Sequence, residues 1–151
     1  MCVQLKQKYG LYINGQWRNA SDGRTFETTT PSTGQHLAYC AEATKEDVDD
    51  AVKAAWNAFP AWKKISPIER ADILLKIADR IDANKELLAK VESLDNGKPI
   101  RETMAIDVPY SSDHFRYFAG AIRTEEGSAS VLDGNMLSLI LHEPIGVVGQ
   151  I

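Results

Sequence analysis

The sequence closes on Glu143-Pro144-Ile145-Gly146-Val147-Val148-Gly149-Gln150-Ile151, and this stretch decides the fold class. A short apolar run with β-branched residues, opened by a proline, is typical of a strand that enters a sheet covered on both faces. We therefore expect an α/β protein. Because no turn signal follows Ile151, and because a bare carboxylate is costly to bury at the end of such a strand, we expect the front part of a larger protein. Its core parallel sheet would be largely missing.

The residues just before this stretch predict a β-hairpin. Asp133-Gly134 is a tight-turn signal. After it, apolar and other residues alternate with the period of a strand, the first set being Leu137, Leu139 and Leu141 and the second Ser138, Ile140 and His142. Ile140 breaks the polar set, so we expect it to meet another protein surface rather than water.

Three helical regions are predicted between residues 44 and 125. Thr44 is an N-cap with Asp47 three residues later, and a single apolar face follows, made of Val48, Val52, Ala55, Trp56, Phe59 and Trp62. Ser66-Pro67 with Glu69 begins the second region, whose apolar stripe is Ile73, Leu74, Ile77, Ile81, Leu88 and Val91, with a break near Ala83-Asn84. It ends at Asp95-Asn96-Gly97-Lys98-Pro99. The third runs from Arg101 to about Glu125, kinked or split by Pro109.

Short strands are predicted before the helices. Leu11 to Trp17 reads as a hairpin around Asn14-Gly15, because that pair supplies the positive φ of a tight turn. Strands then follow at Phe26 to Thr30 and His36 to Ala41.

Composition excludes several classes of partner. The chain has 151 residues, a formal net charge of −4 and a pI near 5.4, so a basic face for nucleic acid or an anionic membrane is not expected. No run approaches the ~20 apolar residues of a membrane span, and the first ten residues have no signal-peptide core. Two lone cysteines, Cys2 and Cys40, give no disulfide framework, and we expect a cytoplasmic protein.

Residue chemistry alone identifies no active site. Cys40 lies in a predicted strand without a histidine or a helix start beside it, so a structural role is favoured over a reactive one, and Cys2 is expected in a frayed terminus. The three histidines, His36, His114 and His142, have no metal-ligand spacing. Gly146 and Gly149 form neither a P-loop nor a dinucleotide fingerprint, and close approach of another backbone explains them better.

Six segments, in order along nearly the whole chain, carry a resemblance to a known family. They are Tyr12-Ile13-Asn14-Gly15-Gln16-Trp17, Pro31-Ser32-Thr33-Gly34, Glu46 to Asp49 with Ala51 to Ala55, Leu94-Asp95-Asn96-Gly97-Lys98-Pro99, Phe115-Arg116-Tyr117-Phe118-Ala119-Gly120 and His142 to Ile151. In this order the chain resembles the amino-terminal part of the NAD(P)-dependent aldehyde dehydrogenase superfamily. Arg101-Glu102-Thr103 and Asp107-Val108-Pro109 look most like bacterial enzymes for acetaldehyde and other small aldehydes.

The resemblance implies an oxidoreductase that converts an aldehyde to a carboxylic acid with NAD or NADP, through a cysteine thiohemiacetal and thioester. The nucleophilic cysteine, the general-base glutamate and most of the cofactor site of the family lie beyond Ile151, so no residue here is expected to be catalytic and the isolated chain is expected to be inactive. Residues 1–126 would be the amino-terminal part of the cofactor-binding domain, 127–144 an oligomerisation hairpin, and 145–151 the start of the first strand of the dinucleotide-binding sheet.

Four residues inherit a site role from the resemblance. Thr28 and Asp95 match positions that help to hold a structural monovalent cation through oxygen ligands, and a helix-ending turn is an equal alternative for Asp95. Tyr110 matches the wall of the aldehyde tunnel, with core packing as the alternative. Ile151 matches a strand edge near the adenosine half of the cofactor.

Partners follow in the same way, namely a small aldehyde and further copies of the chain through the 127–144 hairpin. Two alternatives stay open. One is a non-catalytic interaction module that pairs with a full-length relative through the hairpin, motivated by the apolar strand from Met136 to Leu141. The other is a truncated product that folds poorly.

Overall fold

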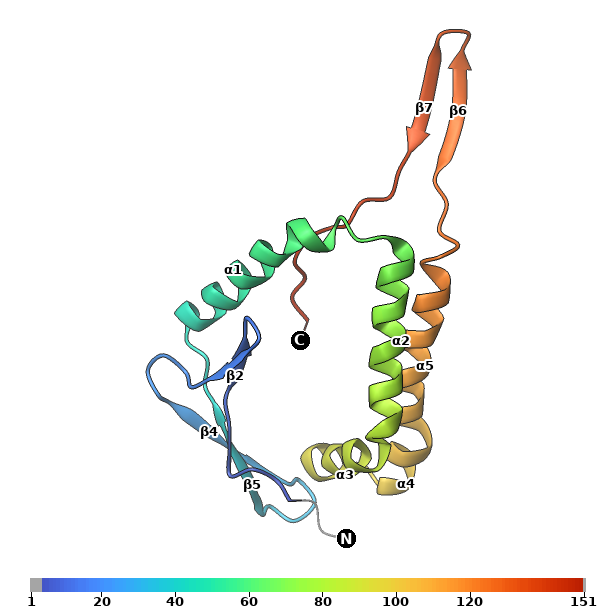
Figure 1. Cartoon of the computed structure of the whole chain (residues 1–151). Helices are drawn as coiled ribbons and strands as arrows, with labels where there is room; N and C mark the ends of the chain where they lie inside the picture. The colour runs from blue at the N-terminus through green and yellow to red at the C-terminus, as the bar shows by residue number, and fades with distance from the viewer. Residues whose placement is uncertain (1–3, 151) are drawn as a thin grey trace.

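The amino-terminal strands form two small sheets in the computed structural model, which describes residues 4–150 (Figure 1). The first sheet has the order β1-β5-β4, with β1 (Lys8–Tyr9) parallel and β4 (Thr25–Thr29) antiparallel to β5 (His36–Ala41). The second is the hairpin of β2 (Leu11–Ile13) and β3 (Gln16–Arg18). Asn14 and Gly15 occupy its turn with φ of 52° and 77°, which confirms the hairpin and the reason for it.

Helix α1 (Lys45–Trp62) begins at the predicted capping box. Asp47 accepts hydrogen bonds from the backbone N–H groups of Thr44 and Ser21, both at 3.0 Å, and its own N–H donates to the Thr44 hydroxyl. The backbone N–H of Thr44, followed by that of Ser21, holds the pKa of the buried Asp47 carboxyl below its usual value. One carboxylate therefore caps the helix and ties it to the loop that follows β3.

The second helical region is two helices, α2 (Pro67–Ala83) and α3 (Lys85–Asn96), separated at Asn84 where the break was predicted. Gly97 ends α3 with φ of 80°, the left-handed conformation expected of that glycine. A Cβ at Gly97 would lie 3.1 Å from Pro31 Cγ, so the end of α3 packs closely on the turn that follows β4.

The third helical region is not broken before Pro109 but changes there to the wider turns of a π-helix. It consists of α4 (Ile100–Glu102), a π-helical stretch η1 (Thr103–Asp107) and α5 (Val108–Ala121). The N–H of Val108 bonds to the carbonyl of Thr103, five residues back, so the chain changes its hydrogen-bonding period just before the proline. Pro109 then lies in the first turn of α5, where its missing N–H costs little. The region ends at Ala121, earlier than the predicted Glu125.

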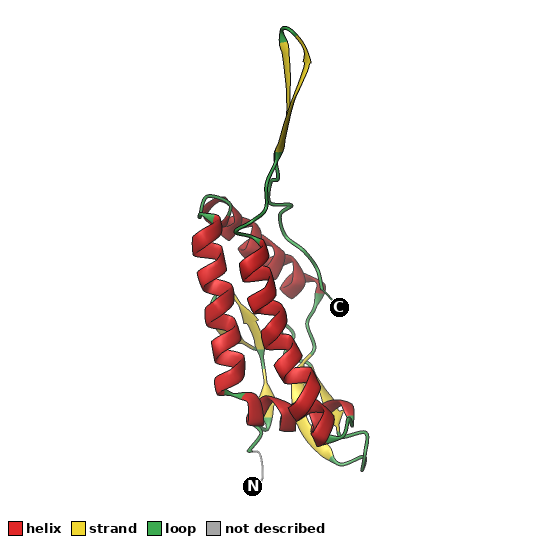
Figure 2. Ribbon diagram, turned by 90° about the vertical axis from the view of Figure 1, so that its right-hand side faces the viewer, coloured by secondary structure: helices red, strands yellow, loops and turns green. Residues whose placement is uncertain are grey.

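Helices α2 and α5 lie side by side, as Figures 1 and 2 both show. Apart from Val108 at the start of α5, the buried residues of the pair are small, namely Ala71, Ala78, Ser112 and Ala119. Small side chains let the helices approach closely. Arg116 of α5 also bonds to Asp79 and Asp82 of α2, at 2.7 and 2.9 Å. Ile73 and Ile77 of α2 remain more than a third exposed.

Strands β6 (Ser128–Asp133) and β7 (Met136–Ile140) form the predicted hairpin, which projects away from the rest of the chain (Figure 1). Its turn is Gly134-Asn135, one residue later than the signal indicated. Nearly every residue of both strands is exposed, including Ile140.

No strand is formed from Ile145 onward in the described residues, and the assignment of residues 145–151 to the first strand of a larger sheet stays a prediction. Residues 141–150 have no regular secondary structure, and Ile145 and Val148 are 90% and 71% exposed. The physical reason is the lack of a neighbour, because a strand is stable only when another strand satisfies its backbone groups and covers its side chains. No described strand pairs with this segment.

Candidate functional site

The two residues expected to hold a cation are brought together. Thr28 lies on β4 and Asp95 in the last turn of α3, and the Thr28 hydroxyl donates a hydrogen bond of 3.3 Å to the Asp95 carboxylate. Among residues 4–150 no three or more histidine, cysteine, aspartate or glutamate side chains gather as a metal-binding group. A cation here would depend on hydroxyl, carboxylate and carbonyl oxygens, which hard cations prefer. The contact is established, and its role as a cation site stays a prediction.

Asp95 also stands at the edge of a hollow of about 290 Å³ between α2, α3 and α5. The residues that line it are mostly apolar, namely Ile81, Leu88, Val91, Glu92, Asp95, Val108 and Ser111. Asp95 thus lies near the end of α3, bonds through its carboxylate to a strand hydroxyl and contributes to the wall of this hollow.

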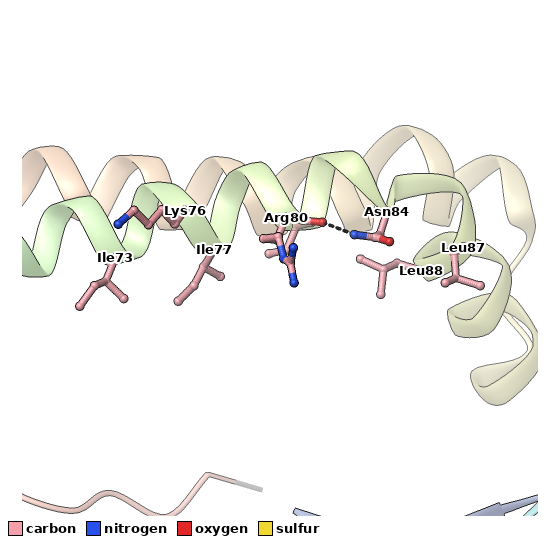
Figure 3. A pocket seen from close by; sticks show the side chains of 8 residues that line it. Ile73, Lys76, Ile77, Arg80, Asn84, Leu87 and Leu88 are labelled. Carbon is pink, nitrogen blue, oxygen red and sulfur yellow. Dashed lines mark hydrogen bonds between the residues drawn. The ribbon is translucent and has the colours of Figure 1, made fainter. Parts of the chain in front are cut away.

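A larger groove of about 470 Å³ runs along α2 and α3, and we call it the α2–α3 groove (Figure 3). Its apolar lining is Ile73, Ile77, Ile81, Leu87 and Leu88, and its polar lining is Lys76, Arg80 and Asn84. In Figure 3 the side chains of Ile73, Ile77 and Leu88 point into the same open space, and the Asn84 amide donates to the Arg80 carbonyl at 2.7 Å. The sequence contained the signal for this groove, since four of its lining residues, Ile73, Ile77, Ile81 and Leu88, belong to the predicted apolar stripe. The sequence did not indicate that Ile73, Ile77 and Leu88 would remain more than a third exposed.

Tyr110 lies in the first turn of α5 and is 62% exposed, so it does not pack in the core of this chain. Its ring meets the His114 ring edge to face, with centroids 4.1 Å apart, and His114 Nδ1 is 2.8 Å from the Tyr110 carbonyl oxygen. His114 thus has a local structural contact. The tunnel role of Tyr110 stays a prediction.

Two contacts that sequence reasoning missed hold this region together. Thr103 is fully buried, and its hydroxyl donates to the Ala89 carbonyl of α3 at 2.9 Å. Lys98 bonds to both carboxylate oxygens of Asp107, at 2.8 and 2.7 Å, and this hydrogen bonding raises the pKa of the Lys98 ammonium. The first pair ties α3 to η1, and the second ties the loop that follows α3 to η1, so both help to position Asp95 relative to the start of α5. No sequence spacing identifies them, because each joins residues on different segments.

Within residues 4–150, Cys40 and the histidines lie in separate local contacts. Cys40 is half-buried in β5, where it pairs in register with Tyr9 and Phe26. His36 and His142 lie instead beside glutamates, Glu27 and Glu125, at 2.8 and 3.2 Å.

Two expected positions, Cys2 and Ile151, fall outside the described residues. Within residues 4–150, no helix has the length and apolar character needed to cross a membrane.

Comparison with known proteins identifies relatives along nearly the whole chain. The model of the aldehyde dehydrogenase family matches residues 17–151. The chain is 52% identical over 149 residues to an aldehyde dehydrogenase of Vibrio cholerae, with 99% of this chain and 29% of the relative covered. It is also 52% identical over 146 residues to acetaldehyde dehydrogenase 2 of Cupriavidus necator, covering 97% and 29%.

Solved structures agree with the sequence comparison. The NAD⁺ complex of an aldehyde dehydrogenase from Bacillus cereus superposes with a TM-score of 0.88 at 36% identity, covering 95% of this chain and 31% of that one. The aldehyde dehydrogenase KauB of Pseudomonas aeruginosa gives a TM-score of 0.89 at 35% identity, covering 94% and 29%. The chain therefore has the architecture of one part of these proteins, and it spans less than a third of the length of the curated relatives it matches.

Proposed function

Since this chain belongs to the aldehyde dehydrogenase family, we propose that it is the amino-terminal part of an enzyme that oxidises an aldehyde to a carboxylic acid with NAD or NADP. The observation that carries the proposal is 52% identity over 99% of the chain to a named aldehyde dehydrogenase. The resemblance in fold to an aldehyde dehydrogenase solved with NAD⁺ supports the nicotinamide cofactor. The cofactor would accept the hydride. The residues of this chain would support that chemistry without performing it.

The proposed division of labour follows the three parts of the chain. Residues 1–126 frame the cofactor-binding domain, 127–144 connect subunits, and 145–151 enter the dinucleotide-binding sheet once neighbouring strands are present. Support for the second assignment comes from the projecting hairpin, whose apolar side chains are exposed. The third assignment is supported by residues 145–148, which have the apolar sequence of a strand and no described strand beside them.

The site residues would act by position. Tyr110 offers an exposed aromatic ring that can contact an apolar substrate, and Thr28 with Asp95 offers two adjacent oxygen ligands for a monovalent cation. Ile151 would contribute to the cofactor side of the sheet edge. A small aldehyde is the proposed substrate, because acetaldehyde dehydrogenase 2 of Cupriavidus necator is 52% identical to the chain.

The isolated chain is proposed to have no turnover. Purified chain is incubated with acetaldehyde and NAD, and NADH absorbance is followed, with the complete Cupriavidus necator enzyme as positive control. No NADH above the protein-free rate is expected. Sustained production in proportion to the concentration of the chain would refute the assignment of the chemistry to other parts of the protein.

A second candidate function, a non-catalytic module that binds a full-length relative through the hairpin, is favoured by one observation. Val131 and Leu137 are paired in register and Leu139 follows on the same face, and all three are exposed. Mixing the chain with the complete Cupriavidus necator enzyme and measuring sedimentation tests it. A complex lost on Leu137→Asp supports the module, and no complex contradicts it.

A further inference from the structure

The ring of Tyr110 is held by His114, which follows it by one turn of α5. The two rings meet edge to face, with centroids 4.1 Å apart and planes inclined at 75°. The imidazole is itself anchored, because His114 Nδ1 lies 2.8 Å from the Tyr110 carbonyl oxygen and donates to it in the Nδ1–H tautomer. An imidazole fixed at one atom and packed on the tyrosine ring restricts the positions that this ring can take.

The backbone that carries Tyr110 is fixed as well. The residue follows closely on η1, and the neighbouring Ser111 hydroxyl donates to the Asp107 carbonyl at 2.8 Å. The Asp107 carboxylate is held in turn by Lys98. One extra residue in a helical turn rotates everything that follows by about 100°, so η1 decides the direction in which Tyr110 points. Short π-helical stretches of this kind are found mostly at functional sites.

The ring of Tyr110 nevertheless remains 62% exposed. A pair that only stabilised α5 would do so whichever way its open face pointed. An exposed ring that a neighbouring side chain already holds in place is suited to contact a ligand, because little rotamer freedom is then lost on binding. The proposed ligand at this position is an aldehyde.

We propose that His114 is a positioning residue for the aldehyde selectivity of the complete enzyme, because it holds Tyr110 where the ring limits the length of the substrate. This inference rests on the proposed function, in which Tyr110 contacts the aldehyde. Acetaldehyde carries only a methyl group beyond its carbonyl and makes few contacts with such a wall. The longer chain of hexanal must pass it, so a ring that can move aside should admit hexanal more readily.

The test uses a complete enzyme in which this chain replaces the matched region of acetaldehyde dehydrogenase 2 of Cupriavidus necator. The quantity measured is the kcat/KM for hexanal divided by that for acetaldehyde, both from NADH absorbance. His114→Ala should raise this ratio about threefold to tenfold, the range that one aromatic pair supports, mainly through a lower KM for hexanal. His114→Phe, which keeps a ring, should stay closer to the parent ratio.

Two further variants show whether His114 acts through Tyr110. In a Tyr110→Ala background, His114→Ala should have no additional effect, because the ring that it positions is gone. Asp113→Ala shortens the exposed neighbouring side chain on the same helix and should leave the ratio unchanged. In the isolated chain, nuclear Overhauser contacts between the Tyr110 and His114 rings should show the pair without any catalysis.

The outcomes separate the inference from the proposed function. A ratio that rises with His114→Ala only when Tyr110 is present supports the inference. An unchanged ratio in an enzyme that oxidises acetaldehyde, an equal rise in the Tyr110→Ala background, or absence of the ring contacts would overturn it and leave the proposed function standing. A folded complete enzyme that oxidises no aldehyde would count against the proposed function and against the role of His114 together.

Discussion

The hydroxyl of Thr103 should be one of the most sensitive single groups in the helical part of the chain. The side chain is 0% exposed, and its hydroxyl lies 2.9 Å from the Ala89 carbonyl and 3.2 Å from the Ile100 carbonyl. The hydroxyl has one hydrogen to donate, so we assign its hydrogen bond to the shorter contact, with the Ala89 carbonyl of α3. Thr103→Val keeps the shape of the side chain and removes this bond.

The expected losses follow from the chemistry removed. A net hydrogen bond between uncharged groups contributes about 1 kcal/mol to the free energy of unfolding, so Thr103→Val should cost about that. Thr103→Ser keeps the hydroxyl and removes a buried methyl, at a cost of about 0.8 kcal/mol. Thr103→Ala removes both and should cost about 2 kcal/mol. These are large fractions of the ~5–15 kcal/mol by which domains are usually stable.

Urea unfolding followed by the helical circular dichroism signal measures all three variants against the parent chain. The informative comparison is between valine and serine, because only one of them lacks the hydroxyl. If Thr103→Val unfolds at the same urea concentration as the parent while Thr103→Ser unfolds as early as Thr103→Ala, the hydroxyl contributes nothing and the reasoning is wrong. A changed slope of the transition would instead show that the variants alter the unfolded or folded ensemble.

Three further predictions concern the junctions around the site. Gly97→Ala should lower the free energy of unfolding by about 1 kcal/mol or more, because φ is 80° and the new Cβ would lie 3.1 Å from the Pro31 ring. Thermal unfolding measures this loss, and an unchanged melting temperature would contradict the prediction. The pKa of the Asp47 carboxyl is held below 3.8 in the folded chain, chiefly by the Thr44 N–H, so the carboxylate stabilises the fold above pH 3.8 and this stabilisation is lost as pH falls through the lower folded pKa. Asp47→Asn should therefore reduce the loss of unfolding free energy between neutral and acidic pH, measured by urea titrations at several pH values. An unchanged loss would refute the assignment. Potassium or sodium ions should raise the melting temperature of the parent chain and not that of Asp95→Asn, with choline as the control cation, and equal shifts would argue against a cation at Thr28 and Asp95.

The helix caps, the glycine that ends α3 and the turn of the first hairpin were found where local signals placed them. Thr44 and Ser66 begin helices, Gly97 ends one and Asn14-Gly15 turns a hairpin, because each depends only on residues a few positions away. The π-helical stretch before Pro109 was not predicted, since its wider hydrogen-bonding period leaves no mark in apolar spacing.

The residues of the candidate site could be named from the sequence, but their contacts could not. Thr28 and Asp95 are 67 positions apart, and only the packing of α3 on the turn after β4 brings their oxygens to 3.3 Å. The apolar stripe of α2 was visible in the sequence, but how much of it would be covered depended on the packing of α5 against α2, where Ala71 and Ala78 are buried.

By itself, then, the sequence determined the helices, the turns and the family likeness, because caps, glycines and short motifs act over a few neighbouring residues. Only the tertiary structure decided which apolar surfaces are left open, which distant polar groups meet, and that Ile145 to Val148 stays unpaired in the described chain. A strand sequence specifies how a segment can pair, but the backbone hydrogen bonds and burial that make it a strand belong to its neighbours.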